Sequence, residues 1–235
     1  MIKVEHIEVW GFEHAIRGMR NPMNSWDKSD SKECYDGWLD GCDSCPLKDK
    51  CSMSEEGYII GKNDLDLMHK LYKAGTEHRK YLRQNFVSMD ITAPLYWWKE
   101  FDTYKVGTVA NSCSTMHKIA AKEFELDDFS HEHLDGNVVV DTYHEEYSNY
   151  DVLDLVIKAL NKNRELYLET KDKNYWWQMI QLLPSSYNQK RTITMSYENV
   201  MTIINQRSNH KLDEWRALVK ELRALPYVEE IRNEN

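Results

Sequence analysis

A mixed α/β fold, with more helix than strand, is the fold class that the sequence predicts. Several segments carry apolar residues at helical spacing, and others show the period-two alternation of a strand. The chain has 235 residues, of which 41% are hydrophobic and 11% aromatic, so it can bury a sizeable core. We therefore expect one domain over residues 1–235, with an insertion at residues 21–57.

The N-terminal quarter combines a strand, a helix and a polar insertion. Residues 2–10 predict a strand, and residues 11–19 predict a short helix. Residues 21–57 are rich in Asp, Ser and Gly and hold four of the five cysteines. This composition predicts a loop-rich insertion, and a helical period over residues 58–84 follows it.

The middle of the chain predicts a strand, a helix and a loop. Residues 85–96 form the strand, with Pro94 at its end or at a bulge, because proline cannot donate to a ladder. Residues 97–125 predict a helix with a polar break near Asn111. The segment 127–140 is expected to be mostly loop, ending in a short extended piece at its three valines.

The C-terminal part is mainly helical. Residues 192–197 alternate with period two and predict a strand. Helical patterns, two of them stopped by prolines, predict helices at residues 147–167, 175–183, 198–207 and 212–225. Helices on a mixed sheet are therefore the architecture that we expect.

Charge and hydropathy exclude some classes of function. The formal net charge of −9 disfavours nucleic-acid binding, which needs a clustered positive surface. A small anionic substrate needs only a local pocket of Arg or Lys and remains possible. No apolar run approaches the length of a membrane span, and the N-terminus lacks the apolar core of a signal peptide. We expect a cytoplasmic protein without membrane or nucleic-acid partners.

Four cysteines of the insertion have the spacing C-x7-C-x2-C-x5-C. A C-x-x-C pair places two thiolates on one metal ion, and two more cysteines complete a tetrahedron. A zinc ion would supply folding energy to a segment too polar to fold alone. An iron–sulfur cluster is the alternative metal, and disulfides or free thiols are the alternatives without metal. The predicted ligands are Cys34, Cys42, Cys45 and Cys51.

One segment carries an unusual mixture of residues. It begins Ala-Pro-Leu-Tyr-Trp-Trp-Lys-Glu at residues 93–100 and continues to Asn-Ser-Cys-Ser-Thr-Met-His at residues 111–117. This order resembles the core of the flavin-dependent thymidylate synthases, in which an Ala-Pro strand precedes an Arg-Gln pair, an Arg-His-Arg triplet and an Asn-Glu-x-Ser segment. Here Lys99 and Glu100 replace the Arg-Gln pair. Only Lys105 keeps a positive charge where the triplet belongs.

Two further features resemble that family, and a third departs from it. Its Gly-His pair corresponds to His78, which fourteen residues separate from Ala93. The family's spacing from a Leu-Pro to a Leu-Arg is kept from Pro184 to Arg207, and His210 follows. An arginine that the family places four residues before this proline is Ile180 here.

The resemblance implies a mixed sheet flanked by helices, assembled as a homotetramer with sites between chains. It implies a flavoenzyme that carries FAD and methylates C5 of deoxyuridine monophosphate (dUMP) reductively, with methylenetetrahydrofolate and NADPH as co-substrates. In this interpretation Arg207 is catalytic, since it polarises the pyrimidine. The other assignments are substrate binding by Asn111, Ser114, Glu100 and Arg191, and cofactor binding by His78, Lys105 and His210.

Several alternatives stay open at this point. The chain can be a pyrimidine nucleotide hydroxymethylase of the same fold, of a kind suited to a bacteriophage, or a non-catalytic nucleotide- or protein-binding relative with structural zinc. Cys113 can act as a covalent catalyst or pack as a small helix residue. The pairs Trp97–Trp98 and Trp176–Trp177 suit either a core and subunit contacts or the stacking of a base or flavin.

Overall fold

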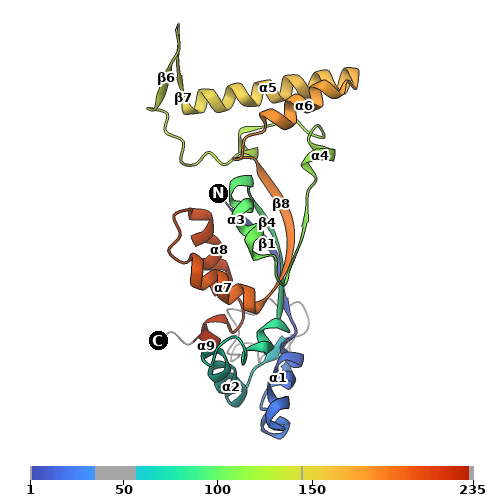
Figure 1. Ribbon diagram of the computed structural model, residues 1–235, viewed down its shortest axis with the longest axis vertical. Coiled ribbons are helices and arrows are strands. Elements are labelled where there is room, and N and C mark those ends of the chain that lie inside the picture. Colours follow the sequence, from blue (N-terminus) through green and yellow to red (C-terminus); the bar gives the residue numbers. More distant parts are fainter. Residues whose placement is uncertain (1, 35–56, 144, 233–235) are drawn as a thin grey trace. The chain divides into compact units, whose positions relative to one another are not determined.

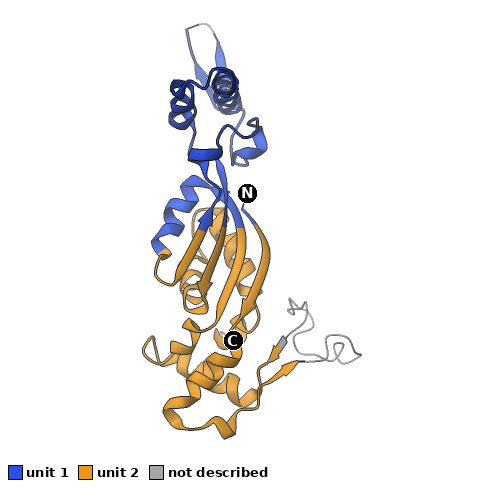
Figure 2. Ribbon diagram, turned by 90° about the vertical axis from the view of Figure 1, so that its right-hand side faces the viewer, with its two compact units in different colours: residues 1–3, 91–103, 111–191 blue, residues 4–90, 104–110, 192–235 orange. Residues whose placement is uncertain are grey.

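A computed structural model of the protein describes residues 2–34, 57–143 and 145–232 (Figure 1). Contacts divide the chain into two compact units, coloured separately in Figure 2. Unit 1 comprises residues 1–3, 91–103 and 111–191, and unit 2 comprises residues 4–90, 104–110 and 192–235. Among the helices that the structure describes, none combines the length and apolar character of a membrane span.

The principal sheet has four strands in the order β1-β4-β8-β5. They are β1 (Lys3–Trp10), β4 (Phe86–Pro94), β5 (Thr108–Ser112) and β8 (Asn188–Ser196). Alternate side chains of β4 are buried, which is the burial expected of a strand with one face on a core. The strands predicted at residues 2–10, 85–96 and 192–197 are confirmed.

Strand β8 begins earlier than the sequence predicts. The prediction started at Thr192, whereas β8 starts at Asn188. Residues 188–191 are all polar, so the sequence shows no alternation of apolar and polar residues there. Gln189 is nevertheless buried, because its Nε2 donates to the carbonyl of Cys113 at 2.9 Å and so satisfies an inward-facing amide.

The helix predicted at residues 97–125 is wrong over most of its length. The helix α3 (Leu95–Phe101) and the short turn η5 (Asp102–Tyr104) are followed by β5 and then by the four-residue helix α4 (Thr115–Lys118). Gly107 has a φ of 75°, which ends the helical path. The β-branched Thr108 and Val109 then suit a strand.

The described residues of unit 2 include five α-helices that pack around a common core. They are α1 (Phe12–Arg20), α2 (Lys62–Lys73), α7 (Tyr197–Arg207), α8 (Asp213–Arg223) and α9 (Val228–Arg232), and the turn η4 (Lys80–Arg83) contacts α1 and α7. The predicted helix 58–84 is thus two shorter pieces, separated near Gly75, whose φ is 105°. Ile16, Met68 and Trp215 are among the buried side chains.

A buried ion pair ties α1 to α2. Arg20 Nε donates to Asp64 Oδ1 at 2.6 Å, and both side chains are almost completely buried. Asp64 Oδ2 also accepts from the hydroxyls of Ser29 and Ser31 at 2.7 and 2.6 Å. These bonds fix the start of the polar insertion against the helical core, because a buried carboxylate needs its partners.

Only the two ends of the insertion are described. They contain the turns η1 (Asn21–Met23) and η2 (Trp26–Lys28) and the strands β2 (Lys32–Cys34) and β3 (Gly57–Ile59). Strands β2 and β3 are antiparallel, with Cys34 opposite Gly57. Cys34 therefore lies opposite the residue at which the described chain resumes, while Cys42, Cys45 and Cys51 lie outside the described residues.

Unit 1 carries a long helical hairpin. The helix α5 (Asn149–Thr170) turns at Lys171, which has a φ of 59°, into α6 (Lys173–Leu182). Buried apolar residues join this hairpin to the preceding loop: Phe124, Phe129, Leu153, Ile157, Leu160 and Met179. The two helices predicted here are confirmed. The extended piece predicted at the valines is the strand β6 (Val139–Asp141), which pairs with β7 (Glu146–Ser148).

Candidate functional site

Arg207 is the last residue of α7, and the helix holds it through a buried face. The hydroxyl of Ser196 caps the first turn by accepting the N–H of Asn199, at 3.4 Å. Ile203 and Ile204 are completely buried one turn before Arg207. The backbone that carries the arginine is therefore fixed by packing.

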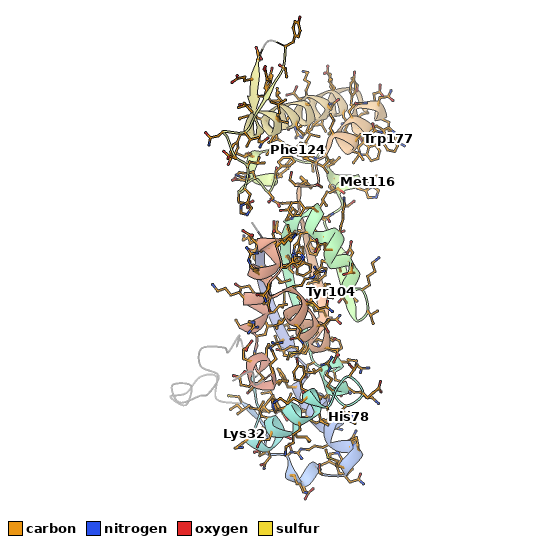
Figure 3. The ribbon with its side chains drawn as sticks, turned by 60° about the vertical axis from the view of Figure 1, so that its left-hand side comes forward. Lys32, His78, Tyr104, Met116, Phe124 and Trp177 are labelled. Carbon is orange, nitrogen blue, oxygen red and sulfur yellow. The ribbon has the colours of Figure 1, made fainter. Side chains whose placement is uncertain are left out.

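Two aromatic side chains hold the guanidinium of Arg207. Its Nε donates to the hydroxyl oxygen of Tyr104 at 2.9 Å, and its central carbon lies 4.6 Å from the ring centroid of Trp215. Tyr104, labelled in Figure 3, donates its own proton to Gln206 Oε1 at 2.8 Å and meets Trp215 edge-on. A stacked and hydrogen-bonded arginine has little rotamer freedom, so its charge has a defined position.

His210 lies beside this cluster. Its backbone N–H donates to the carbonyl of Arg207 at 3.1 Å, and its ring lies 6.2 Å from the ring of Trp215, edge-on. The N–H of Leu212 donates to His210 Nδ1 at 3.2 Å, so the proton of a neutral ring belongs on Nε2. Arg207, His210, Tyr104 and Trp215 thus form one contiguous group in unit 2, the Arg207 cluster.

Arg191 forms a second cluster, in unit 1. Its Nη1 donates to Asp102 Oδ1 at 2.8 Å and its Nε donates to Gln189 Oε1 at 2.9 Å. The guanidinium lies 4.3 Å from the ring centroid of Trp98, whose Nε1 donates to the carbonyl of Gln189 at 2.9 Å. Its Nη2 makes no hydrogen bond within the part of the chain that the structure describes.

The other predicted substrate residues are also in unit 1. Asn111 is exposed on β5, and Glu100 is half-buried on α3. Ser114 caps α4, since its hydroxyl accepts the N–H of His117 at 3.1 Å. The N–H of Cys113 donates to the carbonyl of Lys190 at 2.9 Å, but its thiol is exposed. The interpretation of Cys113 as a buried helix residue is therefore wrong.

The predicted cofactor residues His78 and Lys105 lie in exposed turns of unit 2. The N–H of His78 donates to the carbonyl of Gly75 at 3.0 Å, and Lys105 accepts from Thr108 through its own carbonyl at 3.2 Å. Lys105 makes no ion pair with any described residue. Exposed donors of this kind fit the phosphates of a bound dinucleotide.

The tryptophan pairs differ in burial. Trp97 and Trp98 are buried on α3, with ring centroids 4.8 Å apart. They form part of the core, as one of the two interpretations predicted. Trp176 is half-buried and Trp177 is exposed on α6, so the second pair lies at the surface (Figure 3).

The sequence interpretation missed three residues that position the arginines: Tyr104, Trp215 and Asp102. Tyr104 directly precedes Lys105, in the segment that corresponds to the Arg-His-Arg triplet. An aromatic residue at that place was the signal in the sequence that could have identified it. Nothing in the sequence pairs Asp102 with Arg191, because 89 positions separate them. Among the described residues, no group of three metal-ligating side chains comes together.

Comparisons with known proteins identify the fold. No protein-family model matches the sequence, and no curated protein matches it. Two structures of the flavin-dependent thymidylate synthase ThyX from Helicobacter pylori, both with FAD and dUMP, superpose with TM-scores of 0.63 and 0.62. Their identities are 19% and 18%, and the matches cover 99% and 100% of this chain and 98% of each neighbour.

A third structure extends this group. It is a UMP/dUMP methylase, PolB, from Streptomyces cacaoi bound with 5-Br dUMP, with a TM-score of 0.55 and an identity of 12%. The match covers 99% of this chain and 95% of that one. The chain therefore has the ThyX fold, which confirms the fold that the resemblance implied. At these identities the likeness establishes the fold alone.

Proposed function

We propose that this chain is a flavin-dependent enzyme that modifies dUMP at C5. Structures of the same fold hold FAD with dUMP, or a bromo-dUMP in the methylase. The observation that carries the proposal is Arg207, which keeps its cationic group between Tyr104 and Trp215. A fixed cation suits a uracil ring that must be activated without a covalent partner.

Arg207 would act on the oxygens of the pyrimidine ring. Its guanidinium is always charged and offers several N–H donors in one plane. Donors aimed at a ring oxygen withdraw electron density as negative charge develops there, and they stabilise that charge most when they are already in place. Tyr104 and Trp215 hold the guanidinium before substrate arrives, so little reorganisation is needed.

The residues of unit 1 would bind the rest of the nucleotide. Arg191 is held by Asp102 and Gln189, and its Nη2 is available to a phosphate oxygen. Ser114 and Asn111 supply a hydroxyl and an amide, and Glu100 supplies an acceptor for a hydroxyl or N–H group.

His78, Lys105 and His210 would hold the flavin. A bound flavin would supply the hydride that a reductive methylation needs. Lys105 provides a cation for a phosphate, and the imidazoles provide donors. With one lysine where the family has an Arg-His-Arg triplet, we expect weaker retention of FAD. Methylenetetrahydrofolate as carbon donor, NADPH as reductant and a homotetrameric assembly complete the proposal.

The four-cysteine insertion would bind zinc as a structural ion. Cys34 stands at its junction, opposite Gly57, so a metal there would close the insertion at its base. Elemental analysis of the purified protein should find about one zinc per chain. Iron with sulfide would identify an iron–sulfur cluster instead. A purified protein that contains neither zinc nor iron would contradict the proposal.

The test of the nucleotide site is the affinity for dUMP, measured by calorimetry with FAD present. Arg207→Ala should weaken binding about 10- to 100-fold, since hydrogen bonds to a charged group contribute about 1.5–3 kcal/mol. Arg17→Ala is the matched control, because Arg17 is an exposed arginine of α1 in the same unit. Equal affinities in the two variants would overturn the assignment of Arg207.

A second candidate function follows from the methylase neighbour and from the altered triplet. The chain would then transfer a hydroxymethyl group, or would accept UMP as well as dUMP. Mass spectrometry of the products, with dUMP and UMP supplied in separate reactions, separates these outcomes, since from either substrate a hydroxymethyl product is heavier than a methyl product by one oxygen atom. Without any product, the non-catalytic binding role is favoured.

A further inference from the structure

The cluster around Arg191 contains an acidic side chain beside its cation. Arg191 Nη1 donates to Asp102 Oδ1 at 2.8 Å, and the two groups form an ion pair. The side chain of Arg191 is 15% exposed, whereas that of Asp102 is 45% exposed. An anion that approaches Arg191 from solvent therefore also approaches the carboxylate of Asp102.

Neutral groups fix the guanidinium of Arg191 independently of this charge. Its Nε donates to Gln189 Oε1 at 2.9 Å, and its central carbon lies 4.3 Å from the ring centroid of Trp98. Gln189 and Trp98 are both buried, and the Trp98 Nε1 donates to the carbonyl of Gln189 at 2.9 Å. The charge of Asp102 is thus not needed to hold the arginine in place.

The net formal charge of this cluster is zero, because the carboxylate cancels the guanidinium. Lys190 precedes Arg191 on β8, and successive side chains of a strand point to opposite faces of the sheet. Lys99 is exposed and makes no ion pair with Asp102 in the part of the chain that the structure describes, and solvent screens such a charge. A phosphate at Arg191 therefore meets a cation whose charge is already balanced.

The position of the carboxylate makes the number of phosphate groups matter. Nη1 and Nη2 are attached to the same carbon of a planar guanidinium, so an anion on Nη2 lies close to a carboxylate on Nη1. Like charges at such a separation repel, and the repulsion grows with each added charge. A monophosphate brings one phosphate group to this place, whereas a diphosphate or triphosphate brings further negative groups.

We propose that Asp102 determines specificity for a nucleoside monophosphate, by repelling the additional phosphate groups of a diphosphate or triphosphate from Arg191. This inference rests on the proposed function, since it requires the phosphate of dUMP at Arg191. Asp102 then has two separable properties. Its oxygen accepts the hydrogen bond from Nη1, which an amide oxygen also accepts, and its negative charge repels further phosphates, which an amide does not.

The substitution Asp102→Asn separates these two properties. We would measure the dissociation constants of dUMP, dUDP and dUTP by calorimetry, with FAD present and without divalent cations, which neutralise polyphosphates. The natural chain should bind dUMP most tightly and dUTP most weakly. In Asp102→Asn the ratio of the dUTP constant to the dUMP constant should fall about 3- to 30-fold, as for the removal of one nearby unit charge.

The ratio distinguishes a charge effect from a structural one. A variant that merely disturbed the site would weaken all three ligands together and leave the ratio unchanged. Glu123→Gln is the matched control, because it removes the same charge from an exposed position of the same unit. Its ratio should equal that of the natural chain.

Arg191→Ala distinguishes failure of this inference from failure of the proposed function. If that variant binds dUMP as the natural chain does, the phosphate is not at Arg191, and the assignment of Arg191 and the role of Asp102 are both wrong. If Arg191→Ala weakens dUMP binding at least about tenfold while Asp102→Asn leaves the ratio unchanged, only the role of Asp102 is overturned. Equal affinities of the natural chain for dUMP and dUTP would overturn it as well.

Discussion

Arg207 shows how neighbouring side chains can prepare one charge for binding. Its guanidinium makes a hydrogen bond to Tyr104 and stacks on Trp215. Tyr104 lies 103 positions before Arg207, and Trp215 lies on α8, the helix that follows α7. The segment in which the flavin-dependent thymidylate synthases carry an Arg-His-Arg triplet contains Tyr104 in this chain, and Tyr104 supports Arg207. We infer that Tyr104 positions Arg207.

Tyr104→Phe removes the acceptor and keeps the ring. We predict that the dissociation constant for dUMP rises about 2- to 10-fold, since one hydrogen bond contributes about 0.5–1.5 kcal/mol. Tyr167→Phe is the control, because the Tyr167 hydroxyl, in unit 1, makes no hydrogen bond within the residues that the structure describes. Calorimetric titration of both variants measures the effect, and identical affinities would show that the hydroxyl does not orient the arginine.

Asp64 plays a structural part at the same scale. It is buried and accepts hydrogen bonds from Arg20, Ser29 and Ser31. Burial alone would raise the pKa of this carboxyl, but the bonds from Ser31, Ser29 and Arg20 outweigh burial and lower its pKa. The charged form is therefore the form that stabilises the fold.

Asp64→Asn leaves Arg20 without its carboxylate. We predict a loss of about 3–5 kcal/mol in the free energy of unfolding at pH 7, from urea denaturation, as for other broken buried pairs. Asp66→Asn, two residues along α2, removes an exposed partner of Lys62 and should leave the midpoint unchanged. Equal effects of the two substitutions would mean that the buried ion pair stabilises the fold no more than the exposed one does.

The difference in free energy of unfolding between the natural chain and Asp64→Asn should decrease as the pH falls. Because the folded pKa of Asp64 lies below the unfolded value of about 3.9, its contribution is complete above that value. It is lost as the pH falls through the folded pKa. The gap in stability between the natural chain and Asp64→Asn should therefore shrink from pH 7 to pH 3, and a constant gap would contradict the assignment.

At the scale of elements, periodicity predicted the long helices and the short helix α1, and it failed at the short helices α3 and α4. Helix α5 packs Leu153, Ile157 and Leu160 on α6, so its sequence carries a clear helical period. Between α3 and α4 the chain instead turns at Gly107 into an exposed strand. Glycine conformation and pairing with β8 decided that segment, and neither leaves a periodic pattern.

Helix α5 also begins with a capping box. The hydroxyl of Ser148 accepts the N–H of Asp151, and the carboxylate of Asp151 accepts the N–H and the hydroxyl of Ser148. Ser148→Ala should lower the free energy of unfolding of the protein by about 1 kcal/mol, measured with urea. Ser186→Ala is the control, because the Ser186 hydroxyl makes no hydrogen bond within the described ranges. An equal effect in both variants would contradict the capping role.

At the scale of the whole molecule, the sequence predicted the fold through the order and spacing of a few motifs. The Pro184–Arg207 spacing placed Arg207 at the end of α7, where the structure has it. The clusters around Arg207 and Arg191 needed coordinates, because their members come from distant segments. The predicted substrate and cofactor residues are divided between two compact units, with Arg191 in one and Arg207 in the other.

The measurement that tests the central claim most directly is the visible spectrum of the purified protein, with FAD and then with dUMP. After removal of unbound FAD, the account predicts flavin bands near about 375 and 450 nm that stay with the protein and shift when dUMP is added. The Arg207→Ala variant should keep the bands and lose the shift. A natural chain that retains no flavin and does not respond to dUMP would contradict the claim that it is a flavoenzyme with a pyrimidine site.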